Sequence, residues 1–252
     1  MAGILDTLHP RPQLARQNWL DLRGAWGFSH DDEGRGSDEG WQLQPERFDR
    51  TILVPFPPES KASGIGETGY HPRVWYRREF TLPAPQHGQR VLLHFGAVDY
   101  RADVWVDGQH VAFHEGGHTP FSADITAALR PGQVHTLVVR AEDDPQDIAQ
   151  PRGKQDWRPE PHAIWYHRTT GIWQPVWIEV LGAAQIVDIR WTPDLTRNVL
   201  GLTVSLKRGG DARVRARIQL SLHGTQFADD LCLVPGTSLH REFAVDHATL
   251  GL

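Results

Sequence analysis

Hydrophobic and polar residues alternate along much of the chain with the period of two that is typical of β-strands. The clearest run extends from Tyr100 to Asp107. Its aliphatic residues would lie on one side of a strand and its charged residues on the other. The dipeptide Asp107-Gly108 accepts the positive φ angles of a tight type I′ turn, and a second alternating run occupies residues 110–114. The pattern therefore predicts a β-hairpin.

Further strands are predicted where β-branched and aromatic residues form short runs bounded by proline or glycine. The 24 glycines and 18 prolines are spread along the chain, so few stretches could hold a helix of about 11 residues. Before residue 182 these strands are Thr51–Val54, Val74–Leu82, Arg90–Phe95, Val134–Ala141 and Trp173–Leu181. Together they predict an all-β antiparallel sandwich.

The composition of the sequence changes after Leu181, where tryptophan becomes rare. Nine of the ten tryptophans lie at or before Trp177, and only Trp191 follows. We therefore predict one domain over residues 1–182 and another over residues 183–252. The second has about 70 residues and four or five strands, whereas an immunoglobulin-like sandwich needs about 100 residues and seven strands. It would be incomplete, with strands at Ile186–Thr192, Leu200–Leu206, Val214–His223 and His240–Val245.

The composition narrows the classes of protein to which the chain could belong. A hydrophobic fraction of 39% in 252 residues supports a packed core, and a net charge of −5 provides no basic surface for DNA or RNA. The lone Cys232 excludes an internal disulfide and a cysteine-rich zinc site. With neither a signal-peptide pattern nor a run of about 20 apolar residues, we expect a cytoplasmic protein with no membrane partner.

The segment His114–His118 matches the H-E-x-x-H pattern of zinc peptidases. That chemistry needs both histidines on one face of a helix, with the glutamate activating a metal-bound water. Here the pattern begins at the end of a predicted hairpin strand, contains two adjacent glycines and runs into Thr119-Pro120, all of which disfavour a helix. A turn rich in polar residues is the preferred interpretation.

Aromatic residues are unusually dense before the domain boundary. Five fall within 21 positions, interleaved with histidines and Arg168: Trp157, Trp165, Tyr166, Trp173 and Trp177. Aromatic faces beside polar groups suit the C–H faces and hydroxyl groups of sugars. The alternative is that these rings form core, which we expect for Trp173 and Trp177 because they lie on a predicted strand.

Six segments follow one another in the order found in a known family: Trp19–Phe28, Val54–Pro58, Val74–Phe80, Phe95–Val106, His114–Thr126 and Thr170–Glu179. As a set, covering roughly residues 16–181, they resemble the N-terminal sugar-binding domain of glycoside hydrolase family 2. That family includes β-galactosidases, β-glucuronidases and β-mannosidases. The segment Pro151–Gln155, followed by Ile164–Glu179, is most similar to less characterised bacterial members of the β-galactosidase type.

The resemblance implies a jelly-roll (galactose-binding-like) β-sandwich followed by an immunoglobulin-like β-sandwich and a (β/α)₈ barrel that holds both catalytic glutamates. This chain would stop inside the second of these and contain no catalytic residue. We therefore expect it to contribute to binding a β-linked sugar, without a cofactor and without hydrolysing the sugar alone. A separately encoded catalytic barrel is one possible partner. The alternative is an autonomous carbohydrate-binding or scaffold module, because jelly rolls also serve as lectin domains.

The resemblance also points to positions on the rim of the sugar pocket. The polar residue five before the tyrosine of the W-Y strand is an asparagine followed by proline in β-galactosidases; here it is His71. The family's acid six residues before the glycine of the G-I motif is replaced by Trp165. We expect Trp165 either to stack on a sugar or to pack beneath its loop, with hydrogen bonds supplied by Asp156, Tyr166 or His167. Metal ligation loses a carboxylate at the same position, so we expect no metal.

Overall fold

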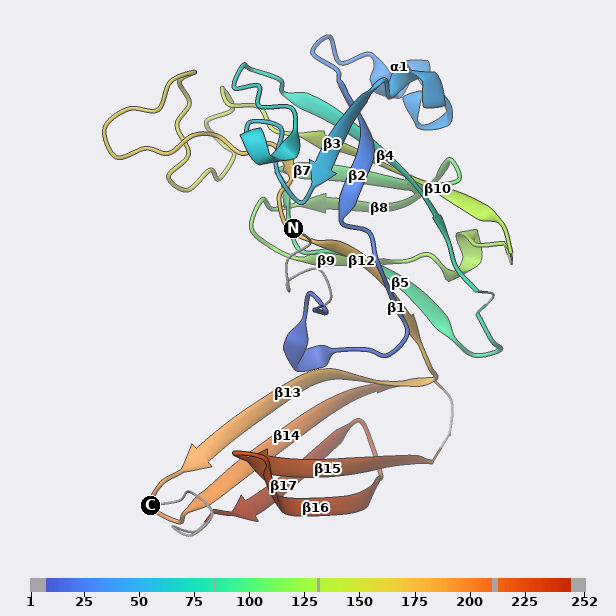
Figure 1. The fold of residues 1–252 in the computed structure, drawn as a ribbon, viewed down its shortest axis with the longest axis vertical. Coiled ribbons are helices and arrows are strands. Elements are labelled where there is room, and N and C mark those ends of the chain that lie inside the picture. The colour runs from blue at the N-terminus through green and yellow to red at the C-terminus, as the bar shows by residue number, and fades with distance from the viewer. Residues whose placement is uncertain (1–7, 84, 131, 210–212, 246–252) are drawn as a thin grey trace. The chain divides into compact units, whose positions relative to one another are not determined.

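The computed structural model describes residues 8–83, 85–130, 132–209 and 213–245 (Figure 1). By its internal contacts the chain divides between Val180 and Leu181. One unit comprises Asn18–Val180, and the other comprises the C-terminal segment together with residues that precede Asn18. In the described part of the chain, no helix is both long and apolar enough to cross a membrane.

The larger unit is a sandwich of antiparallel sheets, as the alternating sequence predicts. One sheet has six strands in the order β3 (Arg50–Val54), β2 (Gly24–His30), β4 (Arg73–Thr81), β10 (Val134–Glu142), β7 (Arg101–Val106) and β8 (Gln109–Glu115). A second has four, in the order β1 (Trp19–Asp21), β12 (Val176–Leu181), β5 (Arg90–Phe95) and β9 (Phe121–Asp124). The short strands β11 (Gly171–Ile172) and β6 (Val98–Asp99) form a separate pair.

Short helical segments connect these strands. The only α-helix in the described residues is α1 (Gly36–Glu39). The 3₁₀ turns are η2 (Pro12–Leu14), η3 (Trp41–Leu43), η4 (Pro45–Arg47), η5 (Lys61–Ser63) and η6 (Thr126–Ala128). The strand expected over residues 173–181 begins only at Val176, because Pro175 has no N–H with which to join the ladder.

The main core consists of the side chains that alternate onto the inner faces of the sheets. Tyr76 is completely buried and packs edge-on against Phe28, with 5.3 Å between ring centroids. Its hydroxyl accepts a hydrogen bond from the Ile172 backbone N–H at 3.2 Å, which ties β11 to the six-stranded sheet. This bond fixes the strand that follows the longest loop of the unit.

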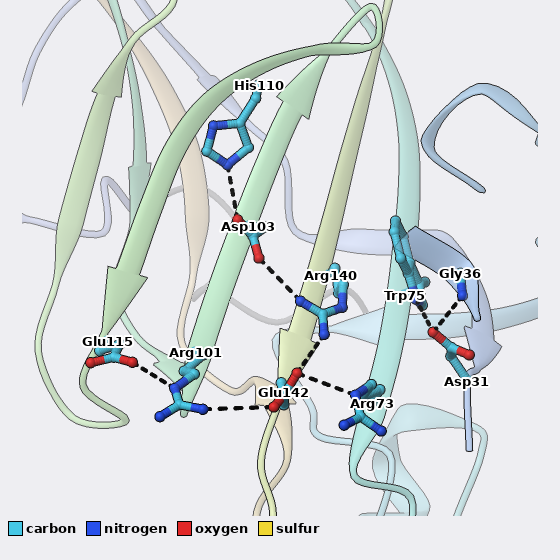
Figure 2. A network of polar contacts seen from close by, with 10 residues as sticks. All are labelled: Asp31, Gly36, Arg73, Trp75, Arg101, Asp103, His110, Glu115, Arg140 and Glu142. Atoms are coloured by element: carbon cyan, nitrogen blue, oxygen red, sulfur yellow. Dashed lines mark hydrogen bonds and ion pairs between the residues drawn. The ribbon is translucent and has the colours of Figure 1, made fainter. Parts of the chain in front are cut away.

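The outward face of the six-stranded sheet carries tryptophan side chains next to a group of ion pairs, and Figure 2 shows Trp75 beside Arg140 of that group. Trp75 stacks on Trp105 with 5.5 Å between centroids and donates a hydrogen bond to the buried carboxylate of Asp31 at 3.1 Å. A network of basic and acidic side chains crosses β8, β7, β10 and β4: His110, Asp103, Arg140, Glu142, Arg73, Arg101 and Glu115. Half-exposed pairs of this kind contribute only about 0–1 kcal/mol each, but they favour one strand register.

The smaller unit has five described strands. They form a three-stranded sheet of β13 (Ala184–Asp194), β14 (Val199–Arg208) and β17 (Ser238–Ala244), and a hairpin of β15 (Val214–Leu222) and β16 (Thr225–Val234). An apolar groove of about 450 Å³ separates them and is lined by Ile186, Leu202, Val214 and Ile218. The described strands thus form an incomplete immunoglobulin-like sandwich, which confirms the fold class predicted from sequence.

Candidate functional site

The most distinctive feature of the larger unit is the long loop of residues 143–170, which joins β10 to β11 and extends from the end of the sandwich (Figure 1). Loops of this length without regular secondary structure are uncommon in compact domains and are usually either functional or disordered. Four of the five residues predicted to touch sugar lie in this loop: Asp156, Trp165, Tyr166 and His167. We refer to residues 143–170 as the aromatic loop.

Hydrogen bonds hold the two arms of the aromatic loop together. The Gln155 side-chain amide donates to Asp99 Oδ2 at 2.7 Å, and its Oε1 accepts from the Thr169 N–H at 2.6 Å. The backbone N–H of Asp156 donates to the Tyr166 carbonyl at 2.8 Å, and the N–H of Tyr166 donates to the Lys154 carbonyl at the same distance. The tip of the loop is therefore presented on a braced stem.

Asp156 organises the loop from inside. It is only 1% exposed, and its carboxylate accepts hydrogen bonds from the Arg158 N–H at 3.0 Å, the His162 N–H at 2.7 Å and His162 Nδ1 at 2.5 Å. Burial would raise the pKa of Asp156, but these hydrogen bonds outweigh it and the pKa is lowered. The carboxylate is thus ionised and occupied within the loop, which makes Asp156 a positioning residue.

The tip exposes one aromatic and one aliphatic side chain to solvent. Tyr166 is 68% exposed and Ile164 is 69% exposed. Trp165 is half-buried, with its ring edge-on to that of Trp157 at 5.5 Å between centroids. Trp157 is itself exposed and also meets His162 edge-on. Trp165 thus packs within the loop and keeps part of its surface open.

Of the other residues singled out in this region, His167 lies in the aromatic loop, whereas Trp173 and Trp177 pack against the sandwich. His167 is half-buried, with Nδ1 3.4 Å from the Arg168 carbonyl oxygen. Trp177 is buried, whereas Trp173 is half-buried and donates a hydrogen bond to the Gly117 carbonyl at 2.7 Å. Both tryptophans pack against the sandwich, away from the tip of the aromatic loop.

Arg168 joins the aromatic loop to a second loop, residues 64–72. Its buried guanidinium donates to the Arg158 carbonyl at 2.5 Å within the first loop. It also donates to the Thr68 and Gly69 carbonyls of the second, at 2.7 and 3.0 Å. The guanidinium lies 4.5 Å from the ring centroid of Tyr70, whose hydroxyl donates to the Trp157 carbonyl at 2.6 Å. Sequence reasoning noted Arg168 only as a neighbour of the aromatic residues and missed Tyr70, because the partners of both are about 90–100 residues away.

His71 follows Tyr70 in the second loop, but its ring contacts Asp32 and His30 and not the aromatic loop. Its Nδ1 is 2.9 Å from Asp32 Oδ1, and the ring stacks on His30 with 3.8 Å between centroids. Burial, followed by repulsion from His71, lowers the pKa of His30 to about 4, so His30 is neutral at neutral pH. Within the described residues, His30, Glu67 and His71 each bring one potential metal ligand to within 4.8 Å of the others.

Three carboxyl groups lie at the base of the aromatic loop. The Thr170 N–H donates to Glu59 at 3.2 Å, and the Thr170 hydroxyl donates to Asp143 at 3.4 Å. Burial raises the pKa of Glu59 and of Asp143. Burial and repulsion from Asp143 together raise the pKa of Asp99 to about 7. The base of the loop is therefore sensitive to pH near neutrality.

The H-E-x-x-H segment has the strand-and-turn structure expected from its glycines. His114 and Glu115 end β8, and the chain then turns before His118. Glu115 pairs with Arg101, while His114 stacks on Phe121 at 4.3 Å and bonds to the Thr119 hydroxyl at 3.0 Å. The residues do not share a helical face, so this segment lacks the arrangement of a zinc peptidase.

Comparison with known proteins identifies the family. Residues 20–147 match the family described as "Glycosyl hydrolases family 2, sugar binding domain". The chain belongs to this family. It is 30% identical over 221 residues to a β-glucuronidase of Paenibacillus borealis, covering 82% of this chain and 37% of that protein. It is 33% identical over 128 residues to a β-galactosidase of Thermoanaerobacter pseudethanolicus, covering 51% of this chain and 16% of that protein.

Solved structures agree on the fold. A β-glucuronidase from Ruminococcus gnavus superposes on 95% of this chain with a TM-score of 0.70 and 24% sequence identity, and the match covers 40% of that protein. The family 2 chain described here thus spans well under half the length of the relatives that it matches. It carries the family's sugar-binding domain, as the six ordered sequence segments indicate.

Proposed function

We propose that the aromatic loop is the sugar-contacting part of this family 2 domain. The observation that carries the proposal is the set of exposed and half-exposed rings at the tip of a braced loop, in a domain whose family is defined by sugar binding. Trp165 and Tyr166 would stack on the C–H face of a β-linked sugar. His167 would donate hydrogen bonds at the rim, and Asp156 would hold the loop in shape.

We further propose that the domain serves a β-glycosidase, as the names of its relatives suggest, and that this enzyme retains the configuration of the sugar, as the family resemblance implies. Retaining hydrolysis needs two carboxyl groups about 5–5.5 Å apart across the glycosidic bond, which family 2 places in a barrel. The described residues form sandwiches and no barrel. The sugar bound by the aromatic loop would therefore be presented to catalytic groups outside these residues, with His71 on the rim on the side of the second loop.

Substitution of the ring at position 165 tests the site. We expect Trp165→Ala to weaken binding of β-linked disaccharides by about 2- to 10-fold from the loss of stacking alone, because a stacked ring contributes roughly 0.5–1.5 kcal/mol beyond its buried area. Titration calorimetry of the full chain with β-glucuronides and β-galactosides measures this. Trp191→Ala is the matched control, since Trp191 is an exposed tryptophan on β13. Unchanged affinity in a folded Trp165→Ala variant would remove Trp165 from the site.

The purified chain of 252 residues is expected to release no aglycone from aryl β-glycosides. Without a carboxylate pair around the glycosidic bond, neither protonation of the leaving group nor nucleophilic attack is available. A chromogenic assay at high protein concentration measures the rate. Activity that survives repurification and is lost on substituting a carboxylate of this chain would contradict the prediction.

A further inference from the structure

A group of metal-ligand side chains lies where the end of β2 meets the second loop. His30 is the last residue of β2, and Glu67 and His71 come from residues 64–72. His30 Nδ1 is 3.5 Å from Glu67 Oε2, and His71 Nε2 is 3.9 Å from the same oxygen. Two imidazoles and one carboxylate thus face one another, although the chain separates His30 from the other two by more than 30 positions.

The spacing of these atoms suits a tetrahedral ion. Zinc binds nitrogen and oxygen ligands at about 2.0–2.2 Å, so two ligands on one tetrahedral ion lie about 3.3 Å apart. The two nitrogen–oxygen separations given above exceed this value by about 0.6 Å or less. The rings of His30 and His71 are stacked and nearly parallel, with 16° between their planes and 3.8 Å between centroids. Because imidazole lone pairs lie in the ring plane, one ring has to turn out of this stack before both nitrogens can bind one ion. His71, half-exposed on a loop, is the ring that would turn.

A second carboxylate fixes which nitrogen of His71 is offered. Asp32 lies 2.9 Å from His71 Nδ1, which leaves Nε2 directed toward Glu67. Histidines that bind metals usually donate their other N–H to a carboxylate in this way, and that contact selects the tautomer and orients the ring. Arg50 acts similarly on Glu67, because its guanidinium holds Oε1 at 2.6 Å and Oε2 at 3.1 Å.

We propose that His30, Glu67 and His71 form a binding site for a divalent transition-metal ion of the zinc class, with water at the fourth position. Two imidazoles with one carboxylate and an open position are a donor set that zinc accepts, whereas magnesium and calcium prefer oxygen ligands alone. Arg50 Nη1 lies 3.3 Å from His30 Nδ1, and the ion takes the place of this long contact while Arg50 keeps its bond to Glu67 Oε1.

The ion would connect two segments that position the aromatic loop. Tyr70 lies between Glu67 and His71, and its hydroxyl holds the Trp157 carbonyl. A metal that joins residues 67 and 71 to the end of β2 therefore stiffens the loop on which Trp157 rests. Binding to the folded state alone also raises the melting temperature, in proportion to the logarithm of the metal concentration over Kd.

Calorimetric titration of the full, tag-free and chelator-treated chain with zinc chloride tests the site. We expect one zinc ion per chain at this site. Asp32→Asn should weaken binding about 10-fold, at the lower end of the range for partners of metal-binding histidines. His71→Ala should weaken binding by at least about 100-fold, because it removes a ligand. His110→Ala is the matched control, because His110 also pairs with an aspartate, Asp103, at 2.9 Å but belongs to β8.

The melting temperature provides a second readout. Zinc should raise it in the wild type and in His110→Ala, but not in His71→Ala. Glu67→Gln, which removes the anionic ligand and keeps the side-chain shape, should also abolish the increase and decides the question if His71→Ala does not fold. Wild-type affinity in either His71→Ala or Glu67→Gln, or an equal loss in His110→Ala, would overturn the proposal.

Discussion

Arg168→Ala is expected to abolish sugar binding by the chain and to lower its stability by about 3 kcal/mol. The guanidinium is 5% exposed and donates to three backbone carbonyls in two loops. Removing it leaves buried acceptors unsatisfied, at about 1–3 kcal/mol each, and some of them regain water as the loops separate. The tip of the aromatic loop then loses its fixed position. Sugar binding would have to order the stacking rings, and the lost conformational entropy weakens the affinity.

Two other variants distinguish the role of the buried, planar Arg168 guanidinium from that of a positive charge alone. Arg168→Lys keeps the positive charge but lacks the planar fork, so it should recover only part of the stability. Arg158→Ala is the control variant, because it removes an exposed arginine side chain from the same loop. The backbone carbonyl of residue 158, which accepts the hydrogen bond from Arg168, is kept, so this variant should behave like the wild type. Urea unfolding followed by tryptophan fluorescence measures stability, and the disaccharide titration measures binding. Wild-type affinity in Arg168→Ala would show that the tie between the loops is not needed.

Local sequence patterns predicted those strands whose residues alternate clearly between hydrophobic and polar or follow a recognisable turn. The hairpin at Asp107-Gly108 is present, with φ angles of 49° and 79° at the two turn residues. The strands predicted before residue 182 lie within a few positions of β3, β4, β5, β10 and β12, because alternation and β-branched residues mark them. Strands β1, β2 and β9 were not predicted. Strand β16 (Thr225–Val234) was missed, because its acidic residues and partly exposed aliphatic residues blur the period of two.

The candidate site could be predicted only in part. The aromatic run drew attention to the aromatic loop, and the family resemblance pointed to His71 and Trp165. The partners of these residues could not be read from spacing, because His71 meets His30 and Asp32 only where β2 ends against the second loop. Asp156 shows the same limit. The sequence alone does not distinguish an aspartate that faces a ligand from one that accepts hydrogen bonds within its own loop, as Asp156 does.

Asp99 makes the stability of the larger unit depend on pH. The carboxyl is 2% exposed, and burial followed by repulsion from Asp143 raises its pKa to about 7 from an ordinary value of 3.8. Between these two pKa values the folded chain keeps a proton that the unfolded chain has released. Stability therefore falls as the pH rises from about 4 to about 7, and the contribution of Asp99 is constant above that range.

Asp99→Asn should remove this dependence. Linkage between the two pKa values gives a loss of about 2 kcal/mol in the wild type from pH 5.5 to pH 8, because one pKa unit corresponds to about 1.4 kcal/mol. Asparagine has the same shape, can accept the hydrogen bond from Gln155 and carries no charge at either pH. The variant should thus be more stable than the wild type at pH 8, with a smaller difference at pH 5.5. Urea unfolding at both pH values measures the change, and Asp144→Asn, at an exposed acid in the same loop, should keep the wild-type dependence. If Asp99→Asn follows the wild-type pH curve, the protonated state of this carboxyl does not support the base of the aromatic loop.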